Sequence, residues 1–131
     1  MRPLEGVRIL LVEDDDDTRE ITRLALEARG ALMVCARDAA EGLKELEART
    51  PDIVLSDIAM PGTDGHTFLK RVRALPRTKG GKIPAVAITA YTSREARLSS
   101  REAGFHYHLA KPYDIEKLTE ILMGLARIKR S

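Results

Sequence analysis

Short apolar runs alternate with longer amphipathic stretches along the whole chain. Their continuous apolar character is typical of strands buried on both faces of a sheet, and they cover residues 7–12, 31–35, 52–57, 84–89 and 107–110. The stretches between them repeat apolar residues three and four positions apart, as helices do. Five strand–helix units in alternation predict an α/β fold, a parallel sheet with helices on both of its faces.

The predicted helices differ in their apolar stripes. Four have a clear stripe, at Ile21, Leu24, Ala25 and Ala28; at Ala39, Leu43 and Leu46; at Phe68, Leu69, Val72 and Leu75; and at Ile115, Leu118, Ile121, Leu122 and Leu125. The stretch 93–103 is instead a polar helix with few large apolar residues, and it carries Arg94, Arg97 and Arg101. The simplest interpretation of this polar helix is a solvated face.

Composition limits the class of protein. The chain has 131 residues, 44% hydrophobic and 32% charged, so we expect one domain over residues 1–131 with its core at about 7–125. Its 22 Lys and Arg barely exceed its 20 Asp and Glu, which argues against direct nucleic-acid binding. The sequence contains no membrane-length apolar run or signal-peptide core, and its single cysteine, Cys35, allows no internal disulfide. We therefore expect a cytoplasmic protein with no membrane contact.

Polar residues directly follow four of the five predicted strands. They are Glu13 and Asp14 after the first strand, Asp57 after the third, Thr89 after the fourth and Lys111 after the fifth. Ligands of open α/β sheets bind outside the carboxyl ends of the strands. We therefore expect three acids, a hydroxyl and an amine to meet at one edge of the sheet.

These residue types suit phosphoryl chemistry. Clustered carboxylates repel one another unless a cation neutralises them, and oxygen ligands favour Mg²⁺. Helix capping explains one or two of the five acids in the run 13–17, but not all of them. An aspartate can attack a phosphoryl group to give an acyl phosphate. Phosphoryl transfer mainly requires charge neutralisation and positioning, which a metal ion, Lys111 and Thr89 would supply around Asp57.

The sequence also resembles a known family over nearly its whole length. The segments ILLVEDD, PDIVLSDIAMPGTDG, AVAITAY and HLAKPY are similar to the motifs of the receiver (phosphoacceptor) domain of two-component response regulators, and they occur in the family order. The opening segment PLEGVRILLVEDD and the segment HLAKP look like those of receivers attached to hybrid histidine kinases. The resemblance implies a flavodoxin-like doubly wound (βα)5 fold with strand order 2-1-3-4-5.

The resemblance also implies roles for particular residues. Asp57 would be the phosphoacceptor, and Thr89 and Lys111 would contact the phosphoryl oxygens. Asp14 would bind Mg²⁺ directly and Glu13 through a water. The further protein ligands would be Asp57 and the backbone carbonyl of Ala59. The donor would be a histidine kinase or a histidine phosphotransfer protein. The domain would be a phosphoacceptor that assists its own phosphorylation and dephosphorylation, not an enzyme acting on a separate substrate.

Other family positions raise further hypotheses. His108 stands where the family often has an aromatic switch residue; it is either a buried, satisfied histidine or a side chain that moves together with Thr89. Ala59 and Tyr91 occupy positions that tune hydrolysis of the acyl phosphate, and here they favour a long-lived phosphoryl group. The family commonly signals through its fourth helix, fifth strand and fifth helix, so a downstream protein partner would contact that face.

Two alternatives stay open. Residues 14–18 fit D-x-D-x-T, which resembles the nucleophile motif of haloacid-dehalogenase-type phosphatases with Asp14 as nucleophile. Against it, such enzymes need a later acidic pair where this chain has Lys111, and Asp57 would have no role. The second alternative is a pseudo-receiver, an interaction module that is never phosphorylated, but the five intact site residues argue against it. Nucleotide-binding glycine loops of either common pattern are absent.

Overall fold

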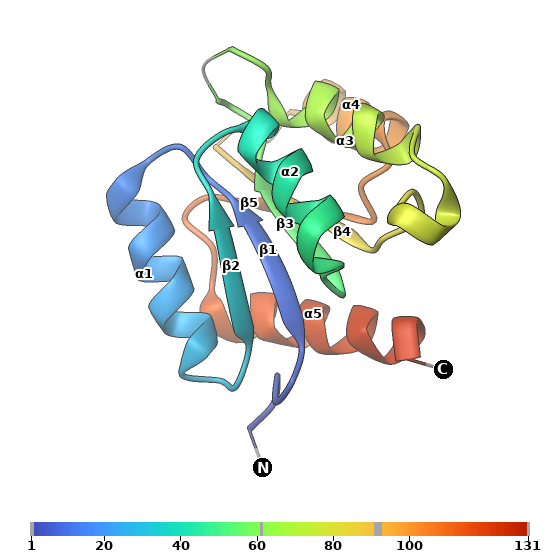
Figure 1. The fold of residues 1–131 in the computed structure, drawn as a ribbon. Helices are drawn as coiled ribbons and strands as arrows, with labels where there is room; N and C mark the ends of the chain where they lie inside the picture. The colour runs from blue at the N-terminus through green and yellow to red at the C-terminus, as the bar shows by residue number, and fades with distance from the viewer. Residues whose placement is uncertain (1, 61, 91–92, 131) are drawn as a thin grey trace.

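The computed structural model describes residues 2–60, 62–90 and 93–130, which fold into five strand–helix units (Figure 1). A single turn of 3-10 helix, Arg77–Lys79, precedes the fourth strand. The strands are β1 Arg8–Val12, β2 Leu32–Ala36, β3 Ile53–Asp57, β4 Ala85–Thr89 and β5 Tyr107–Ala110. The helices are α1 Asp16–Glu27, α2 Ala39–Arg49, α3 Gly65–Arg73, α4 Arg94–Ala103 and α5 Ile115–Arg130. Each predicted element is present, with ends within a few residues of those expected.

All the paired strands are parallel, in the order β2-β1-β3-β4-β5, which confirms the predicted topology. α1 and α5 cover one face of the sheet, and α2, α3 and α4 cover the other (Figure 1). Because successive side chains of a strand point to opposite faces, each strand contributes to both layers. In β1, Leu10 and Val12 pack beneath α2 and α3, whereas Ile9 and Leu11 pack beneath α1 and α5.

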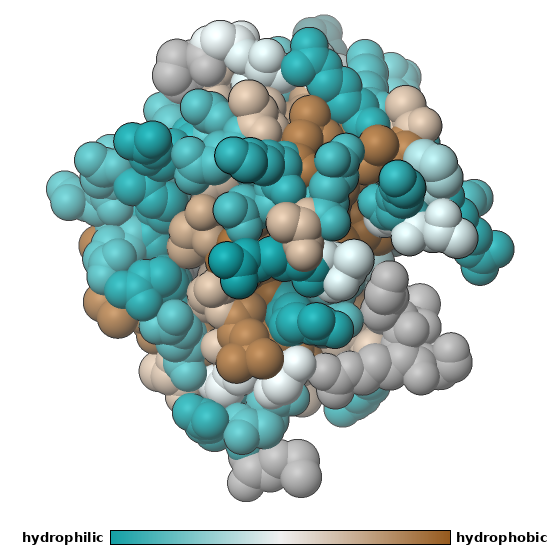
Figure 2. Space-filling view, viewed as in Figure 1, coloured by the Kyte–Doolittle hydropathy of each residue, from teal (hydrophilic) through white to brown (hydrophobic). Residues whose placement is uncertain are grey.

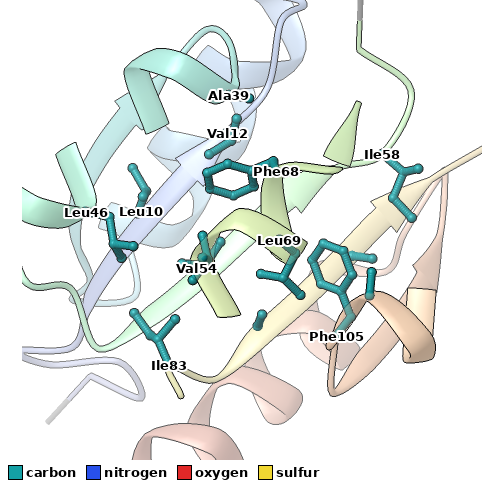
Figure 3. Packing of buried hydrophobic residues seen from close by; sticks show 14 of the residues in the cluster. Leu10, Val12, Ala39, Leu46, Val54, Ile58, Phe68, Leu69, Ile83 and Phe105 are labelled. Carbon is teal, nitrogen blue, oxygen red and sulfur yellow. The ribbon is translucent and has the colours of Figure 1, made fainter. Parts of the chain in front are cut away.

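The two apolar layers give the fold its rigidity. Figure 3 shows the α2–α3 side, where Phe68 and Leu69 of α3 belong to one apolar cluster with Val54 of β3 and Leu46 of α2. On the opposite face α5 buries three leucines, Leu118, Leu122 and Leu125. In the view of Figure 2, hydrophilic residues cover most of the surface and apolar residues are exposed in small patches. Among the described residues, no helix has the length and apolar character needed to cross a membrane.

The apolar stripe predicted for the first helix is wrong in its direction. Ile21 is 66% exposed and Leu24 is 53% exposed, while Thr22 and Leu26 face the core. Thr22 is buried because its hydroxyl forms a hydrogen bond with the hydroxyl of Tyr113 after β5. A threonine thus takes a core position on α1, and the aliphatic side of the helix is left in solvent.

Candidate functional site

The carboxyl ends of β1, β3 and β5 bring four of the predicted site residues into contact. One carboxylate oxygen from each of Glu13, Asp14 and Asp57 lies within 4.8 Å of the other two. Lys111 Nζ lies 2.8 Å from Glu13 Oε1 and 3.1 Å from Asp57 Oδ2, so one ammonium joins two of the acids. We call these four residues the acidic site. It contains three carboxylates and one cation.

The remaining predicted positions lie beside this cluster. Thr89 is fully buried at the end of β4, and its carbonyl accepts a hydrogen bond from the Lys111 backbone N–H at 2.9 Å. The Ala59 backbone N–H donates to Asp57 Oδ1 at 3.2 Å, which places this residue against the same carboxylate. Tyr91 lies outside the described residues, so the hypothesis about acyl-phosphate lifetime stays a prediction.

The backbone around Asp57 is held from several sides. The Ser56 hydroxyl donates to the Asp57 carbonyl at 2.8 Å, and the Gly65 N–H donates to the Ile58 carbonyl at 2.9 Å. A Cβ on Gly65 would lie 2.4 Å from the Asp57 carbonyl oxygen, so only glycine permits α3 to begin this close to β3. Asp57 itself is only 6% exposed. The carboxylate therefore projects from a fixed backbone.

The acidic site has more carboxyl groups than cations, and two of these carboxyl groups are buried. Glu13 is 3% exposed, and burial together with the nearby Asp57 charge raises the pKa of Glu13 to about 7, although the hydrogen bond from Lys111 opposes this. Burial also acts to lower the pKa of Lys111, but its hydrogen bond with Glu13 and the charges of Asp57 and Glu13 raise that pKa above its ordinary value. Lys111 therefore remains an ammonium at neutral pH, and one positive charge faces three carboxyl groups.

Two other acids of the run 13–17, Asp15 and Asp16, have structural roles. The Asp15 side chain accepts from the Thr18 N–H at 2.8 Å and caps α1, and hydrogen bonds with Thr18 lower the pKa of Asp15. Asp16 forms an exposed ion pair with Arg19, in the first turn where negative charge suits the helix dipole. Within the described residues, neither joins the metal-sized cluster of carboxylates.

A second polar cluster lies between α3, α4 and β5. The hydroxyl of buried Ser100 on α4 is 3.0 Å from His66 Nε2 of α3 and 2.8 Å from His108 Nδ1 of β5. We call these residues the His–Ser–His chain. Because a serine has one hydroxyl proton, at least one of the two histidines donates N–H to the Ser100 oxygen.

The sequence pointed to His108 but not to its two partners. His108 is half-buried and lies beside Ala87 of β4, and Thr89 lies beside Ala110, so His108 and Thr89 share one face of the sheet. This placement agrees with the predicted switch position, while a coupled movement stays a prediction. The spacing of Ala96, Ser100 and Ala103 marks the inward side of α4 and indicates in retrospect that Ser100 is buried.

Comparisons with known proteins agree with this geometry. Residues 9–123 match the family model of the response regulator receiver domain. The chain belongs to the response regulator receiver family. Receiver domains bind Mg²⁺ in an acidic pocket and are phosphorylated on an aspartate, which are general properties of this family.

Individual relatives place the receiver among proteins of very different lengths. It is 42% identical over 122 residues to an uncharacterised 14.6 kDa protein of Leptolyngbya boryana, covering 93% of this chain and 92% of that protein. It is 32% identical over 114 residues to the DNA-binding transcriptional regulator NtrC of Escherichia coli, covering 87% of this chain and 24% of NtrC. The sensor histidine kinase CheAY of Helicobacter pylori is 33% identical over 116 residues, with 87% of this chain and 14% of CheAY covered. The receiver thus spans less than a quarter of these two longer relatives.

Solved structures confirm the fold. A CheY-like receiver domain protein of Methanospirillum hungatei superimposes with a TM-score of 0.85 at 27% identity, covering 95% of this chain and 96% of the other. The chemotaxis response regulator CheY4 of Vibrio cholerae gives a TM-score of 0.82 at 27% identity, with 91% and 98% of the two chains covered. Both share the doubly wound five-stranded architecture.

Proposed function

We propose that this receiver accepts a phosphoryl group on the Asp57 carboxylate, and that the donor is a phosphohistidine of a histidine kinase or of a histidine phosphotransfer protein. One carboxylate oxygen forms a bond to phosphorus while the phosphorus–nitrogen bond of the donor breaks, and the histidine nitrogen keeps the electron pair. The observation that carries this proposal is the contact of Lys111 with Asp57, at 3.1 Å, beside two further acids.

The residues around Asp57 have complementary roles in this proposal. The Lys111 ammonium, already next to Asp57, holds the negative charge of the incoming phosphoryl oxygens. The Thr89 hydroxyl, at the end of β4, donates a hydrogen bond to a phosphoryl oxygen. Because Thr89 and His108 lie on the same face of the sheet, a movement of Thr89 on phosphorylation affects His108 of β5. Receiver output then depends on the different affinities of partners for the two states.

The donor set fits a magnesium ion. Three carboxylates within 4.8 Å of one another, with only one ammonium among them, offer oxygen ligands of the charge that this ion prefers. The pKa of Glu13 is raised by burial and by the charge of Asp57, two effects that a bound cation would oppose. Glu13, Asp14, Asp57 and the Ala59 carbonyl would hold the ion. When bound, it supplies charge neutralisation to the phosphoryl oxygens.

The phosphatase alternative lacks support in the geometry. A D-x-D-x-T nucleophile motif would use Asp14 with Asp16, but the Asp16 carboxylate is exposed and paired with Arg19. Asp57, by contrast, is buried and in contact with Lys111. These contacts favour Asp57 as a phosphoacceptor over Asp14 as the nucleophile of a phosphatase.

The exposed apolar side of α1 is the surface on which the phosphodonor docks. A donor must bring its phosphohistidine to Asp57 and therefore covers surface that borders the acidic site. A cavity of about 620 Å³ provides this continuity, since Ile21 of α1 and Lys111 both line it, together with Tyr113. An apolar helix side at this position suits a helical donor surface.

The experiment for the acidic site is an intact-mass measurement after incubation with acetyl phosphate. The wild type is expected to gain one phosphoryl group only when Mg²⁺ is present, and Asp57→Asn is expected to gain none. Failure of the wild type to gain mass with acetyl phosphate or with any of a panel of histidine kinases would favour the pseudo-receiver. An adduct that persists in Asp57→Asn but disappears in Asp14→Asn would support the phosphatase instead.

A second experiment tests the docking surface. The double variant Ile21→Glu with Leu24→Glu should lose phosphoryl transfer from a phosphorylated histidine phosphotransfer protein but keep uptake from acetyl phosphate, which needs no docking. Leu98→Glu on α4 provides a matched control, because Leu98 is also an exposed apolar residue. Equal loss of transfer in the control, or unchanged transfer in the double variant, contradicts docking on α1.

A further inference from the structure

α4 turns almost its entire surface to solvent. Its only described buried residues are Ser100 and Ala103, so it adds almost nothing to the apolar core. Leu98 is 48% exposed and is the only large aliphatic side chain on the helix. A helix that buries so little of itself is available to contact another molecule.

One side of α4 is strongly basic. Arg94, Arg97 and Arg101 follow one another at spacings of three and four residues, which aligns them with Leu98 along the helix. None of the three arginines forms an ion pair with another residue that the structure describes, unlike Arg23 of α1, which pairs with both Glu20 and Glu27. The positive charge on this side of α4 is therefore not neutralised within the protein.

The basic side of α4 borders a groove against β5. A cavity of about 410 Å³ lies there, with the three arginines and Leu98 on one wall and Tyr107 and His108 on the other. Tyr107 is 49% exposed although it belongs to a strand. The groove thus combines an apolar centre, made by Leu98 and Tyr107, with cationic groups along one wall.

This combination favours an acidic protein segment over a nucleic acid. Over the two turns from Arg94 to Arg101 the groove offers three cations, too few for the six to ten phosphate contacts of a typical DNA-binding surface. Two glutamates, Glu95 and Glu102, stand on the same helix and oppose a polyanion. An apolar side chain seated between Leu98 and Tyr107 would bury area that a sugar-phosphate backbone does not offer.

We propose that the α4–β5 groove binds an acidic amphipathic segment of a partner protein, with an apolar side chain between Leu98 and Tyr107 and carboxylates on Arg94, Arg97 and Arg101. This inference rests on the proposed function, because it names the chemistry of the segment that reads the output face. The groove is connected to the phosphoacceptor, since its His108 is joined through Ser100 to His66, the residue after Gly65.

Peptide selection tests the proposal even though the partner protein is unidentified. A displayed library of random 12-residue peptides is selected on the receiver carrying beryllium trifluoride as a phosphoryl mimic, and recovered peptides are titrated by fluorescence anisotropy. The groove variant is Arg97→Glu with Arg101→Glu. The matched control is Lys44→Glu with Lys79→Glu, which changes the charge equally at exposed lysines of α2 and of the turn before β4.

The recovered peptides are expected to contain an excess of Asp and Glu around a Leu, Ile or Phe. They should bind the groove variant at least about tenfold more weakly than wild type, bind the control within about twofold, and weaken as salt is raised. Failure to recover peptides, recovery of peptides without excess acid, or equal binding to the groove variant overturns the proposal. Tighter binding of a 12-nucleotide single strand or duplex, lost in the groove variant, would replace it with a nucleic-acid site.

Acetyl phosphate uptake, measured on the same protein samples, separates this proposal from the function on which it rests. Normal uptake by wild type without acidic peptides means that the docking chemistry is wrong and the phosphoacceptor is right. If the protein takes up no phosphoryl group but acidic peptides still bind the groove, the docking chemistry is right. The proposed coupling of the groove to phosphorylation of Asp57 is then wrong.

Discussion

The two polar clusters of this receiver are built in opposite ways. The acidic site holds three carboxyl groups against the single ammonium of Lys111, and burial together with the Asp57 charge raises the pKa of Glu13 to about 7. The His–Ser–His chain holds no acid, and one ring nitrogen of each histidine is hydrogen-bonded to the Ser100 hydroxyl. The first cluster has more negative charge than its own residues neutralise, and the second is held together by hydrogen bonds among its own residues.

This difference indicates which cluster serves a ligand. A buried charged group that lacks a neutralising partner lowers the free energy of unfolding, and a ligand of opposite charge restores it. The acidic site therefore lowers the stability of the protein when no cation is bound. A cluster that is satisfied internally contributes to stability instead, and here it joins α4 to α3 and β5. Stability measurements on each cluster should therefore respond in opposite directions.

The largest expected effect is at Glu13. Its pKa in the folded protein lies above the ordinary value of 4.5, so the folded state holds this proton more tightly and loses stability as the pH rises from about 4.5 through 7. Without Mg²⁺, Glu13→Gln should raise the free energy of unfolding at pH 8 by about 2 kcal/mol and by much less at pH 5. Denaturant titrations at the two pH values measure the difference.

Glu47→Gln provides the control, since Glu47 is an exposed acid of α2. Adding Mg²⁺ should stabilise the wild type at pH 8 and reduce the advantage of Glu13→Gln, because the ion supplies the missing positive charge. A variant less stable than wild type at pH 8 in the absence of Mg²⁺ would mean that Lys111 alone neutralises the site.

A smaller loss is expected at Ser100. Ser100→Ala removes the hydroxyl shared by His66 and His108, and should cost about 1–2 kcal/mol. The loss should be local, with faster amide hydrogen exchange in α4 and unchanged exchange in α5, which is held by Leu118 and Leu122. Ser99→Ala is the matched control because Ser99 is the exposed neighbour on the same helix. Equal protection of α4 in both variants would show that the chain does not hold the helix.

The smallest effect should be the acid sensitivity of the same cluster. Burial lowers the pKa of His66, Asp64 opposes this, and His108 and Lys70 add to the lowering. The unfolded chain therefore gains this proton first, and stability is lost as the pH falls through about 6.5, the ordinary histidine value. Glu13 adds stability as the pH falls over the same range, so the measurement uses a Glu13→Gln background. In that background, His66→Gln should reduce the drop in Tm between pH 7.5 and 5.5, and His106, whose pKa burial also lowers, contributes to the part that remains. An identical drop in both proteins would place the acid sensitivity elsewhere.

The acidic site was largely predictable from the sequence, whereas the His–Ser–His chain was not. Parallel strands end at one edge of the sheet, so a polar residue directly after an apolar run is already placed in space, as Glu13, Asp57 and Lys111 show. His66 and Ser100 are 34 residues apart on two helices, and their meeting depends on how α3 and α4 pack. Only His108, which lies within a short strand, could be noticed in advance.

The sequence also could not predict which side of α1 faces the core. Periodicity identifies an apolar side but not what lies opposite it, and the partner that makes Thr22 a core residue, Tyr113, is 91 positions away. Periodicity therefore puts the aliphatic residues Ile21 and Leu24 on the apolar side of the helix, although this side faces solvent. An apolar stripe on a short helix can indicate a contact with another protein as well as a contact with the core.

The close approach of Gly65 to Asp57 has a mechanical consequence. Where side chains separate two elements, a rotamer change can absorb a small displacement before it spreads. Here the first residue of α3 rests directly on the carbonyl of Asp57 and on the Ile58 backbone, so no rotatable bond lies between them. The joint is stiff, and we expect α3 to follow any movement of the strand end as a rigid lever. A substitution of Gly65 would therefore change how much α3 moves when the end of β3 is displaced, even in a variant that still folds.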